Sequence, residues 1–191
     1  MPTSPRILAF SASARRESLN RKFLSAAVTS VRAAGGEVTL IDLNDYVLPL
    51  YHGDLEEAEG LPANATRLVE LIAAHSGVLI ASPEYNSMIT PLLKNTLDWC
   101  SRADEDPFPG KVAAIVSASP GPFGGVRSQK LAQQLLLQLG CHIVPVQAIL
   151  PRADKAFDAT GALIDARAQK AVDTLAASLV ETSRRLTGPA T

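Results

Sequence analysis

The hydrophobic pattern alternates between two kinds of segment along the chain. Short continuous apolar runs, rich in Val, Ile and Leu, are typical of buried strands. Between these runs, apolar residues recur every three or four positions, which is the spacing of one helix face. The runs predict strands at 6–10, 37–42, 78–82, 111–117 and 142–150, the last of which Pro145 could bend. The periodic segments predict helices beginning at 19, 62 and 91, a helix with Leu131, Leu135 and Leu139 on one face, and a final helix at 163–186.

Strands that alternate with helices predict an α/β fold, with a parallel sheet covered by helices on both faces. Right-handed crossovers leave few strand orders, and we expect a doubly wound, five-stranded sheet in the order 2-1-3-4-5. The length of 191 residues fits a single domain spanning 1–191. Loops rich in Ser, Gly and Pro follow the first, third and fourth strands. In this strand order all three loops meet at the carboxyl edge of the sheet, where ligands bind in open α/β folds.

The loop after the first strand is a candidate phosphate site, because it opens a helix whose first turn has unpaired N–H groups and a partial positive charge. Arg15 or Arg16 could add positive charge, although the two arginines could also be a solvated surface pair. Neither a G-x-x-x-x-G-K-[ST] loop nor a G-x-G-x-x-G loop after the first strand occurs, so we expect a ligand with a single phosphate. The loop also has short polar side chains, those of Ser11, Ser13, Ser18 and Asn20. Ser18 could instead be simply the N-cap of the helix.

The charge balance argues against several classes of partner. The chain has 18 Lys and Arg against 19 Asp and Glu, which gives no electrostatic case for binding nucleic acid or an anionic membrane. Cys100 and Cys141 lie in apolar segments and are expected to be buried, reduced thiols. Because no signal-peptide pattern and no apolar run near the length of a membrane span occurs, we expect a cytoplasmic protein. The stretch 43–60 is expected to be an irregular loop with a solvated His52.

Three parts of the chain resemble the motifs of one family. Ala12–Asn20 is similar to G-S-x-R-x-x-S-x-N. Pro83–Asn86 and Leu93–Trp99 match P-E-Y-N and L-K-N-x-x-D-W with the same intervening length. Ser117–Gly125 is similar to the Ser/Gly-rich turn that precedes G-G-x-R. On these motifs, the chain resembles the NADPH-dependent FMN reductase family of flavodoxin-like proteins, which also includes quinone, chromate and azo-dye reductases.

The resemblance implies an FMN-dependent oxidoreductase that uses NADPH or NADH as co-substrate and passes hydride, in a ping-pong scheme, to a flavin, a quinone or a similar small electron acceptor. Because a flavin carries the redox chemistry itself, no catalytic side chain is expected. The resemblance also implies a homodimer or homotetramer, with the 91–102 helix and Trp99 as the contact. The implied cofactor-binding residues are Ser11, Ser13, Arg15, Ser18, Leu19 and Asn20 in the first loop, Pro83, Glu84, Tyr85, Asn86 and Ser87 in the second, and Ser117, Ala118, Ser119, Gly121, Gly124 and Gly125 in the third.

Some positions depart from the family pattern or allow two interpretations. Ala12 stands where the family often has glycine, Glu17 places a carboxylate beside the proposed phosphate, and Met88–Pro91 differs from the commoner Ser-x-Pro-Gly. Arg127 could contact another subunit or the phosphate of a nicotinamide nucleotide. The N–H groups of 119–125, together with the positive end of the helix that follows, are expected to face the flavin pyrimidine.

Other readings of the same sequence remain open. Lys94, Asn95, Asp98 and Trp99 could have structural or interface roles, since they lie well inside a helix rather than in a loop. An electron-transfer flavodoxin without NAD(P)H activity has the same fold, but flavodoxins are usually strongly acidic, whereas this chain has a formal charge of −1. A third possibility is a flavin-free regulatory protein with this fold.

Overall fold

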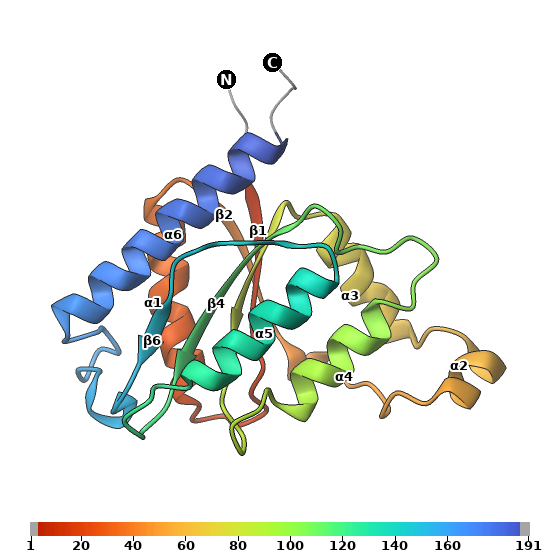
Figure 1. Cartoon of the computed structure of the whole chain (residues 1–191), viewed down its shortest axis with the longest axis horizontal. Coiled ribbons are helices and arrows are strands. Elements are labelled where there is room, and N and C mark those ends of the chain that lie inside the picture. The colour runs from red at the N-terminus through yellow and green to blue at the C-terminus, as the bar shows by residue number, and fades with distance from the viewer. Residues whose placement is uncertain (1–3, 188–191) are drawn as a thin grey trace.

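The strands form one parallel sheet in the order β2-β1-β3-β4-β5, as predicted (Figure 1). The structure, a computed structural model, describes residues 4–187. The expected fifth strand is broken into two short strands. The first pairs with the start of β4 and the second pairs with the end of β4. The break contains Pro145, which has no N–H to donate to the ladder. The strands are β1 (Arg6–Ser11), β2 (Glu37–Asp42), β3 (Gly77–Ala81), β4 (Val112–Ala118), β5 (His142–Ile143) and β6 (Ala148–Leu150).

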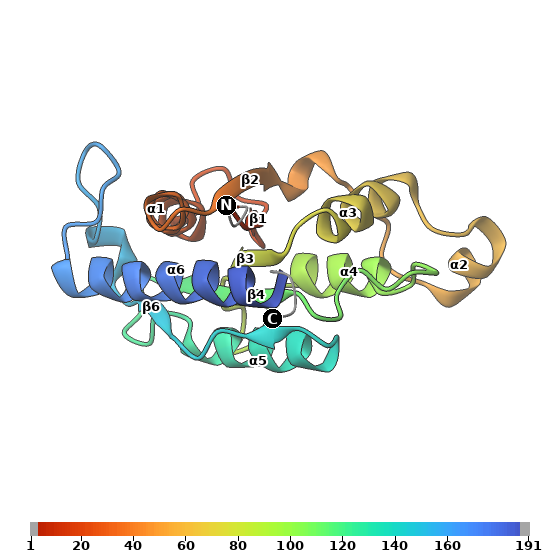
Figure 2. The same cartoon turned by 90° about the horizontal axis from the view of Figure 1, so that it is seen from above.

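Helices cover both faces of the sheet (Figure 2). One apolar core lies under α1 and α6, and a second lies under α3, α4 and α5. Alternate residues of β1 belong to the two cores. Ile7 and Ala9 pack in the core under α1, whereas Leu8 and Phe10 pack in the core on the opposite face. The helices are α1 (Leu19–Ala33), α2 (Gly53–Glu59), α3 (Ala63–Ala73), α4 (Pro91–Cys100), α5 (Val126–Gln138) and α6 (Ala166–Thr187), with 3₁₀ turns at Leu43–Asp45 (η1) and Ala153–Lys155 (η2).

Three expectations about local structure are wrong. The stretch 43–60 is not wholly irregular, because it contains η1 and the short helix α2. The last helix begins at Ala166, after a turn closed by a bridge between Phe157 and Leu163. The buried face of α5 is formed by Ser128, Gln129, Ala132 and Leu136, while the three leucines expected there are only half-buried.

The polar residues on the buried face of α5 explain why apolar spacing misjudged it. The Gln129 side-chain amide donates to the carbonyl oxygens of Ile115 (2.7 Å) and Ala148 (3.2 Å), so it satisfies backbone groups inside the core. Ser128 Oγ donates to the Pro83 carbonyl at 2.7 Å. Buried polar side chains with such partners are stable in a core, although a hydrophobic pattern assigns them to the surface.

Both cysteines are free and buried, as predicted. Burial raises the pKa of the Cys100 thiol to about 12, and burial together with nearby Asp106 raises the pKa of Cys141 to about 12. Within the described residues, no helix combines the length and the hydrophobicity that crossing a bilayer requires.

Candidate functional site

The three predicted loops meet at one cavity of about 380 Å³ at the carboxyl edge of the sheet. The first loop joins β1 to α1, the second joins β3 to α4, and the third joins β4 to α5. Residues from 117–125 thus lie beside residues from 13–20, close to a hundred positions earlier in the sequence. The cavity is lined by Ser13, Arg15, Glu17, Ser18, Leu19, Asn20, Pro83, Glu84, Tyr85, Ala118, Ser119, Pro120 and Asp154.

Seven of the predicted binding residues do not line this cavity. Ser11 faces the α1 side of the sheet, as alternation along β1 requires, and borders a separate depression beside Arg21 and Asp42. Its Oγ is buried without a hydrogen-bond partner in the described structure. The other six are in the second and third loops: Asn86, Ser87, Ser117, Gly121, Gly124 and Gly125.

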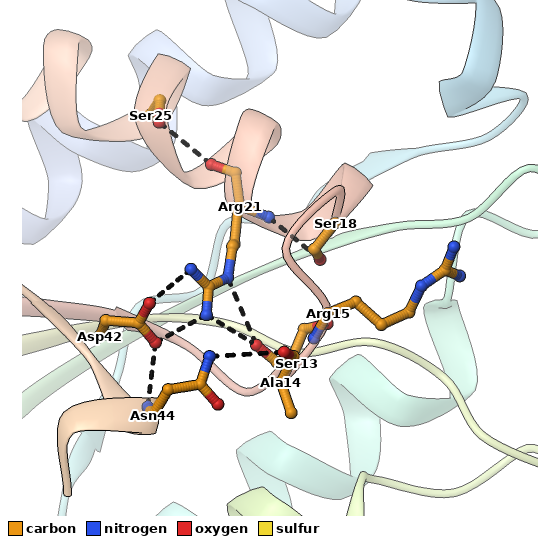
Figure 3. Close-up of polar contacts among 8 residues, drawn as sticks. All are labelled: Ser13, Ala14, Arg15, Ser18, Arg21, Ser25, Asp42 and Asn44. Carbon is orange, nitrogen blue, oxygen red and sulfur yellow. Dashed lines mark hydrogen bonds and ion pairs between the residues drawn. The ribbon is translucent and has the colours of Figure 1, made fainter.

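In the first loop, the carbonyls of Ser13 and Ala14 are occupied, while most backbone N–H groups have no acceptor within the described residues. Its carbonyls at Ser13 and Ala14 accept hydrogen bonds from Arg21 and Asn44 (Figure 3). Successive free N–H groups at the start of a helix make an anion site, and this donor set suits a phosphate. Within residues 4–187, no hydrogen-bond acceptor is found for the N–H groups of Ser13, Ala14, Arg16, Glu17, Ser18, Leu19 and Asn20.

The polar side chains of the first loop also have structural roles. Ser18 is the N-cap of α1, where its Oγ accepts from the Arg21 N–H at 3.4 Å, and it lines the cavity as well. The Asn20 amide donates to the Ala118 carbonyl at 2.8 Å and accepts from the Ala118 N–H at 2.9 Å. Asn20 therefore joins the first loop to the third. The side chain of Arg15 is exposed and extends away from this cluster in Figure 3.

The second loop ends in a tight hairpin turn. Tyr85 and Met88 exchange two backbone hydrogen bonds of 3.0 Å. The two residues between them have left-handed backbones, with φ of 52° at Asn86 and 67° at Ser87. Both are exposed. A turn of this kind explains the asparagine, which tolerates positive φ better than most residues. These two residues lie outside the cavity lining, whereas Pro83, Glu84 and Tyr85 are part of it.

Glu84 has a role that the sequence did not reveal. Its carboxylate accepts from the backbone N–H groups of Arg127 (3.1 Å) and Ser128 (3.3 Å) in the first turn of α5, and from Arg127 Nε (2.8 Å). Burial alone would raise the pKa of Glu84, but these hydrogen bonds outweigh it and hold the pKa below its usual value. A carboxylate from another loop therefore already caps the positive end of α5, a contact that the expectation of this helix end facing the flavin pyrimidine did not include.

This pairing gives Arg127 a structural role that neither of the two expected contacts included. Its guanidinium pairs with Glu84 of its own chain, and it lies 5.4 Å from the centre of the Phe123 ring. Arg127 therefore links the second loop to the third.

The third loop requires close backbone contacts. A Cβ atom on Gly125 would lie 1.9 Å from Ser117 Oγ, and one on Gly124 would lie 2.8 Å from the Pro151 nitrogen. Ser117 Oγ is buried and donates to the Ser82 carbonyl at 2.7 Å, while the Gly121 N–H donates to Ser119 Oγ at 3.1 Å. These contacts fix the shape of the loop, and of the residues that make them only Ser119 lines the cavity.

The matched motif of α4 holds a neighbouring loop rather than the cavity. Trp99 is fully buried, and its indole N–H donates to the Pro49 carbonyl at 2.8 Å. Asn95 donates to the same carbonyl at 2.9 Å and accepts from the Tyr51 N–H. Lys94 and Asp98 form an ion pair on the helix surface. Because Trp99 is covered by its own chain, the expected subunit contact through this residue is wrong.

Two features of the cavity were missed in the sequence. Asp154, from η2, adds a carboxylate to the lining, in addition to that of exposed Glu17, which the sequence already indicated beside the proposed phosphate. Thr90 Oγ1 donates to the Ala12 carbonyl at 2.9 Å, so the unusual segment Met88–Pro91 is tied to the first loop. Across residues 4–187, no group of three or more His, Cys, Asp and Glu side chains is arranged to hold a metal ion.

Comparisons with known proteins agree with this architecture. The family model described as NADPH-dependent FMN reductase matches residues 5–155. An NAD(P)H-dependent FMN reductase of Pseudomonas aeruginosa is 38% identical over 184 residues, covering 96% of this chain and 97% of that protein. An NADPH:quinone oxidoreductase of Arabidopsis thaliana is 34% identical over 190 residues, covering 96% and 94%. Among solved structures, a flavoenzyme NAD(P)H:acceptor oxidoreductase from Paracoccus denitrificans matches with a TM-score of 0.81 and 27% identity, covering 95% of this chain and 98% of that one. An archaeal flavodoxin, 10% identical with a TM-score of 0.61, shares the fold over 94% of this chain and 99% of its own.

Proposed function

The chain belongs to the NADPH-dependent FMN reductase family, and we propose that it passes hydride from NAD(P)H through FMN to a small acceptor such as a free flavin or a quinone. The observation that carries the proposal is the row of unpaired N–H groups in the first loop, which opens onto the cavity where all three loops meet. A helix start with free N–H groups suits the phosphate that distinguishes FMN from riboflavin.

The residues of the cavity fit this cofactor. The first loop would hold the phosphate, mainly through backbone N–H groups, with Ser13 and Arg15 as side-chain contributors. Pro83–Tyr85 of the second loop and Ala118–Pro120 of the third would flank the ring system. When bound, FMN supplies the hydride and electron chemistry, so the protein has only to bind and orient it.

The proposed reaction needs no acidic or basic side chain at a fixed distance. Glu84 is hydrogen-bonded to Arg127 and to the start of α5, and is thus not available as a proton carrier. We therefore assign no catalytic residue. The nicotinamide nucleotide would bind over the open side of the cavity, leave, and be replaced by the acceptor. This ping-pong scheme predicts parallel lines in double-reciprocal plots at several fixed acceptor concentrations, and converging lines would exclude it.

We also propose a cellular location and an assembly. A cytoplasmic location fits two buried thiols without a disulfide, because disulfides are rare in reducing compartments. A homodimer or homotetramer would have to use a surface other than Trp99. Two exposed apolar side chains, Tyr85 in the cavity lining and Phe123 in the third loop, would suit either a subunit or an acceptor contact.

The test of the function uses the purified protein. Added FMN should shift its visible absorbance and raise its melting temperature, and NADPH should be consumed with FMN, a quinone or ferricyanide as acceptor. Arg15→Ala should weaken FMN binding more than riboflavin binding. FMN binding without NAD(P)H oxidation would indicate a flavodoxin-type carrier instead, and no response to FMN would exclude the proposal.

A further inference from the structure

A cluster of charged and polar side chains joins the first loop to α1 and to the end of β2 (Figure 3). Arg21 extends from α1 and forms a two-pronged ion pair with Asp42 at the end of β2, with Nη2 at 2.6 Å from Oδ1. The same guanidinium donates to the Ser13 carbonyl through Nε (3.4 Å) and Nη2 (3.3 Å). Asn44 donates its N–H to Asp42 Oδ1 at 2.9 Å and its side-chain amide to the Ala14 carbonyl at 3.3 Å.

Neither member of this ion pair lines the cavity. Arg21 and Asp42 instead border the separate depression between α1 and β2, of about 420 Å³. Their side chains are partly buried, with 28% and 35% of their surface exposed. Burial would raise the pKa of Asp42, but hydrogen bonds from Arg21 and Asn44 outweigh it and keep the pKa below its usual value, so the carboxylate stays charged near neutral pH.

The cluster determines which backbone groups the loop turns toward a ligand. A peptide carbonyl carries partial negative charge and would repel a phosphate, whereas the N–H groups on the same backbone attract it. Because Arg21 and Asn44 occupy the carbonyls of Ser13 and Ala14, while most N–H groups of the loop have no acceptor in the described structure, we infer that the N–H groups are the ones offered to a ligand. Asp42 in turn fixes Arg21, since a bidentate carboxylate contact aligns the planar guanidinium.

We propose that Arg21 and Asp42 are positioning residues whose ion pair, acting through the Ser13 carbonyl, sets the affinity of the first loop for the phosphate of FMN. This inference rests on the proposed function, because it requires FMN to bind in the adjacent cavity. It assigns a binding role to two residues that do not line the cavity. The role also explains why α1 and β2 are joined by charge at the carboxyl end of the edge strand.

The test compares two ligands that differ only in the phosphate. Dissociation constants of FMN and riboflavin are measured by flavin fluorescence for the wild type, Arg21→Gln and Asp42→Asn. Arg185→Gln and Glu181→Gln serve as matched controls, because they remove one charge from an ion pair on α6, far from the cavity. Arg21→Lys keeps the positive charge but loses the bidentate geometry of the guanidinium, and it provides a second variant should Arg21→Gln fold poorly.

We expect FMN to bind at least tenfold more weakly to Arg21→Gln and Asp42→Asn, with riboflavin affinity changed less than twofold. Arg21→Lys should fall between Arg21→Gln and the wild type. The double variant should be no weaker than the worse single variant, because both changes release the same carbonyl. The α6 controls should match the wild type with both ligands.

Three results would overturn the inference. Equal losses of FMN and riboflavin affinity would mean that the pair only supports the fold, and unchanged FMN affinity would mean that the loop is held by other contacts. Losses that add up in the double variant would show that the two residues act separately. If the wild type does not bind FMN, the proposed function is overturned together with this inference. Each of the three results above, in contrast, would leave the proposed function standing.

Discussion

Replacing Glu84 with glutamine tests how the second and third loops are joined. Glu84 accepts two backbone N–H groups in the first turn of α5, which no other side chain caps, since the N-cap residue is Gly125. A side chain at position 125 is excluded by the contact with Ser117, so the cap has to come from another part of the chain. The substitution keeps the size of the side chain and removes its charge.

The expected loss follows from these contacts. The glutamine amide oxygen can still accept from the α5 N–H groups, but hydrogen bonds to a charged acceptor contribute about 1 kcal/mol more than those to a neutral one, so the cap is weakened by about that amount. The ion pair with Arg127 adds less than about 1 kcal/mol, because the Arg127 side chain is 53% exposed and its charge is screened by water. Together they predict a loss of about 1–2 kcal/mol in the free energy of unfolding at pH 7. For a chain of this length, that corresponds to a fall in melting temperature of about 2–8 °C.

The pH dependence gives this prediction a specific signature. The pKa of Glu84 lies below its usual 4.5 in the folded state, so the unfolded chain binds the proton more readily. Stability from the carboxylate is therefore complete above pH 4.5 and is lost as the pH falls through the folded value. The difference in melting temperature between wild type and Glu84→Gln should be constant from pH 6 to 8 and should narrow below about pH 4.5.

Thermal unfolding followed by circular dichroism measures both quantities. Glu57→Gln is the matched control, because Glu57 is exposed on α2 and forms no hydrogen bond or ion pair within the described residues. The reasoning is refuted if Glu84→Gln and Glu57→Gln melt together at pH 7. It is equally refuted if the difference from wild type persists unchanged at pH 3.5.

Three further changes have defined outcomes. Gly125→Ala should lower the free energy of unfolding by more than about 2 kcal/mol, because the added Cβ would meet Ser117 and the backbone φ is +84°. Gly53→Ala, whose Cβ would have no atom within 4 Å, should be nearly neutral, and a denaturant titration measures both. Burial holds the pKa of His75 below 6.5, so the unfolded state gains the proton first, and stability should fall from pH 7.5 to 5.5 more in the wild type than in His75→Gln. Trp99→Phe should lower stability by about 1–3 kcal/mol through lost packing and a lost hydrogen bond, measured by circular dichroism because no other tryptophan is present.

Strand positions and strand order could be predicted from the sequence, because buried parallel strands leave continuous apolar runs whose connections have few allowed topologies. The meeting of three loops at one cavity followed from that order. The break at Pro145 was also visible, although the sequence did not show that β5 and β6 would share one partner, β4.

Contacts between loops could not be predicted in the same way. Glu84 and Arg127 are 43 positions apart, and Arg21 and Asp42 are 21 apart, so no local spacing connects them. A polar residue after a buried strand suggests a ligand site, but it equally suits a partner in a neighbouring loop. The burial of Gln129 could not be predicted for the same reason. A glutamine in a helix is assigned to the surface until its backbone hydrogen-bond partners are known.

The polar residues of the site therefore divide into two kinds, and this division determines how the cavity is built. Side chains that a sequence motif assigns to a ligand, such as Asn20, Glu84 and Ser117, mostly bond to the backbone of another loop. The groups left for a ligand are largely backbone N–H groups, which every sequence possesses and no motif marks. Because buried hydrogen bonds between loops form as the chain folds, the ordering of the loops is accomplished before a ligand arrives, and binding need not supply it. The conspicuous residues of the motifs thus specify the shape of the cavity, while recognition of the phosphate falls to the main chain that they hold in place.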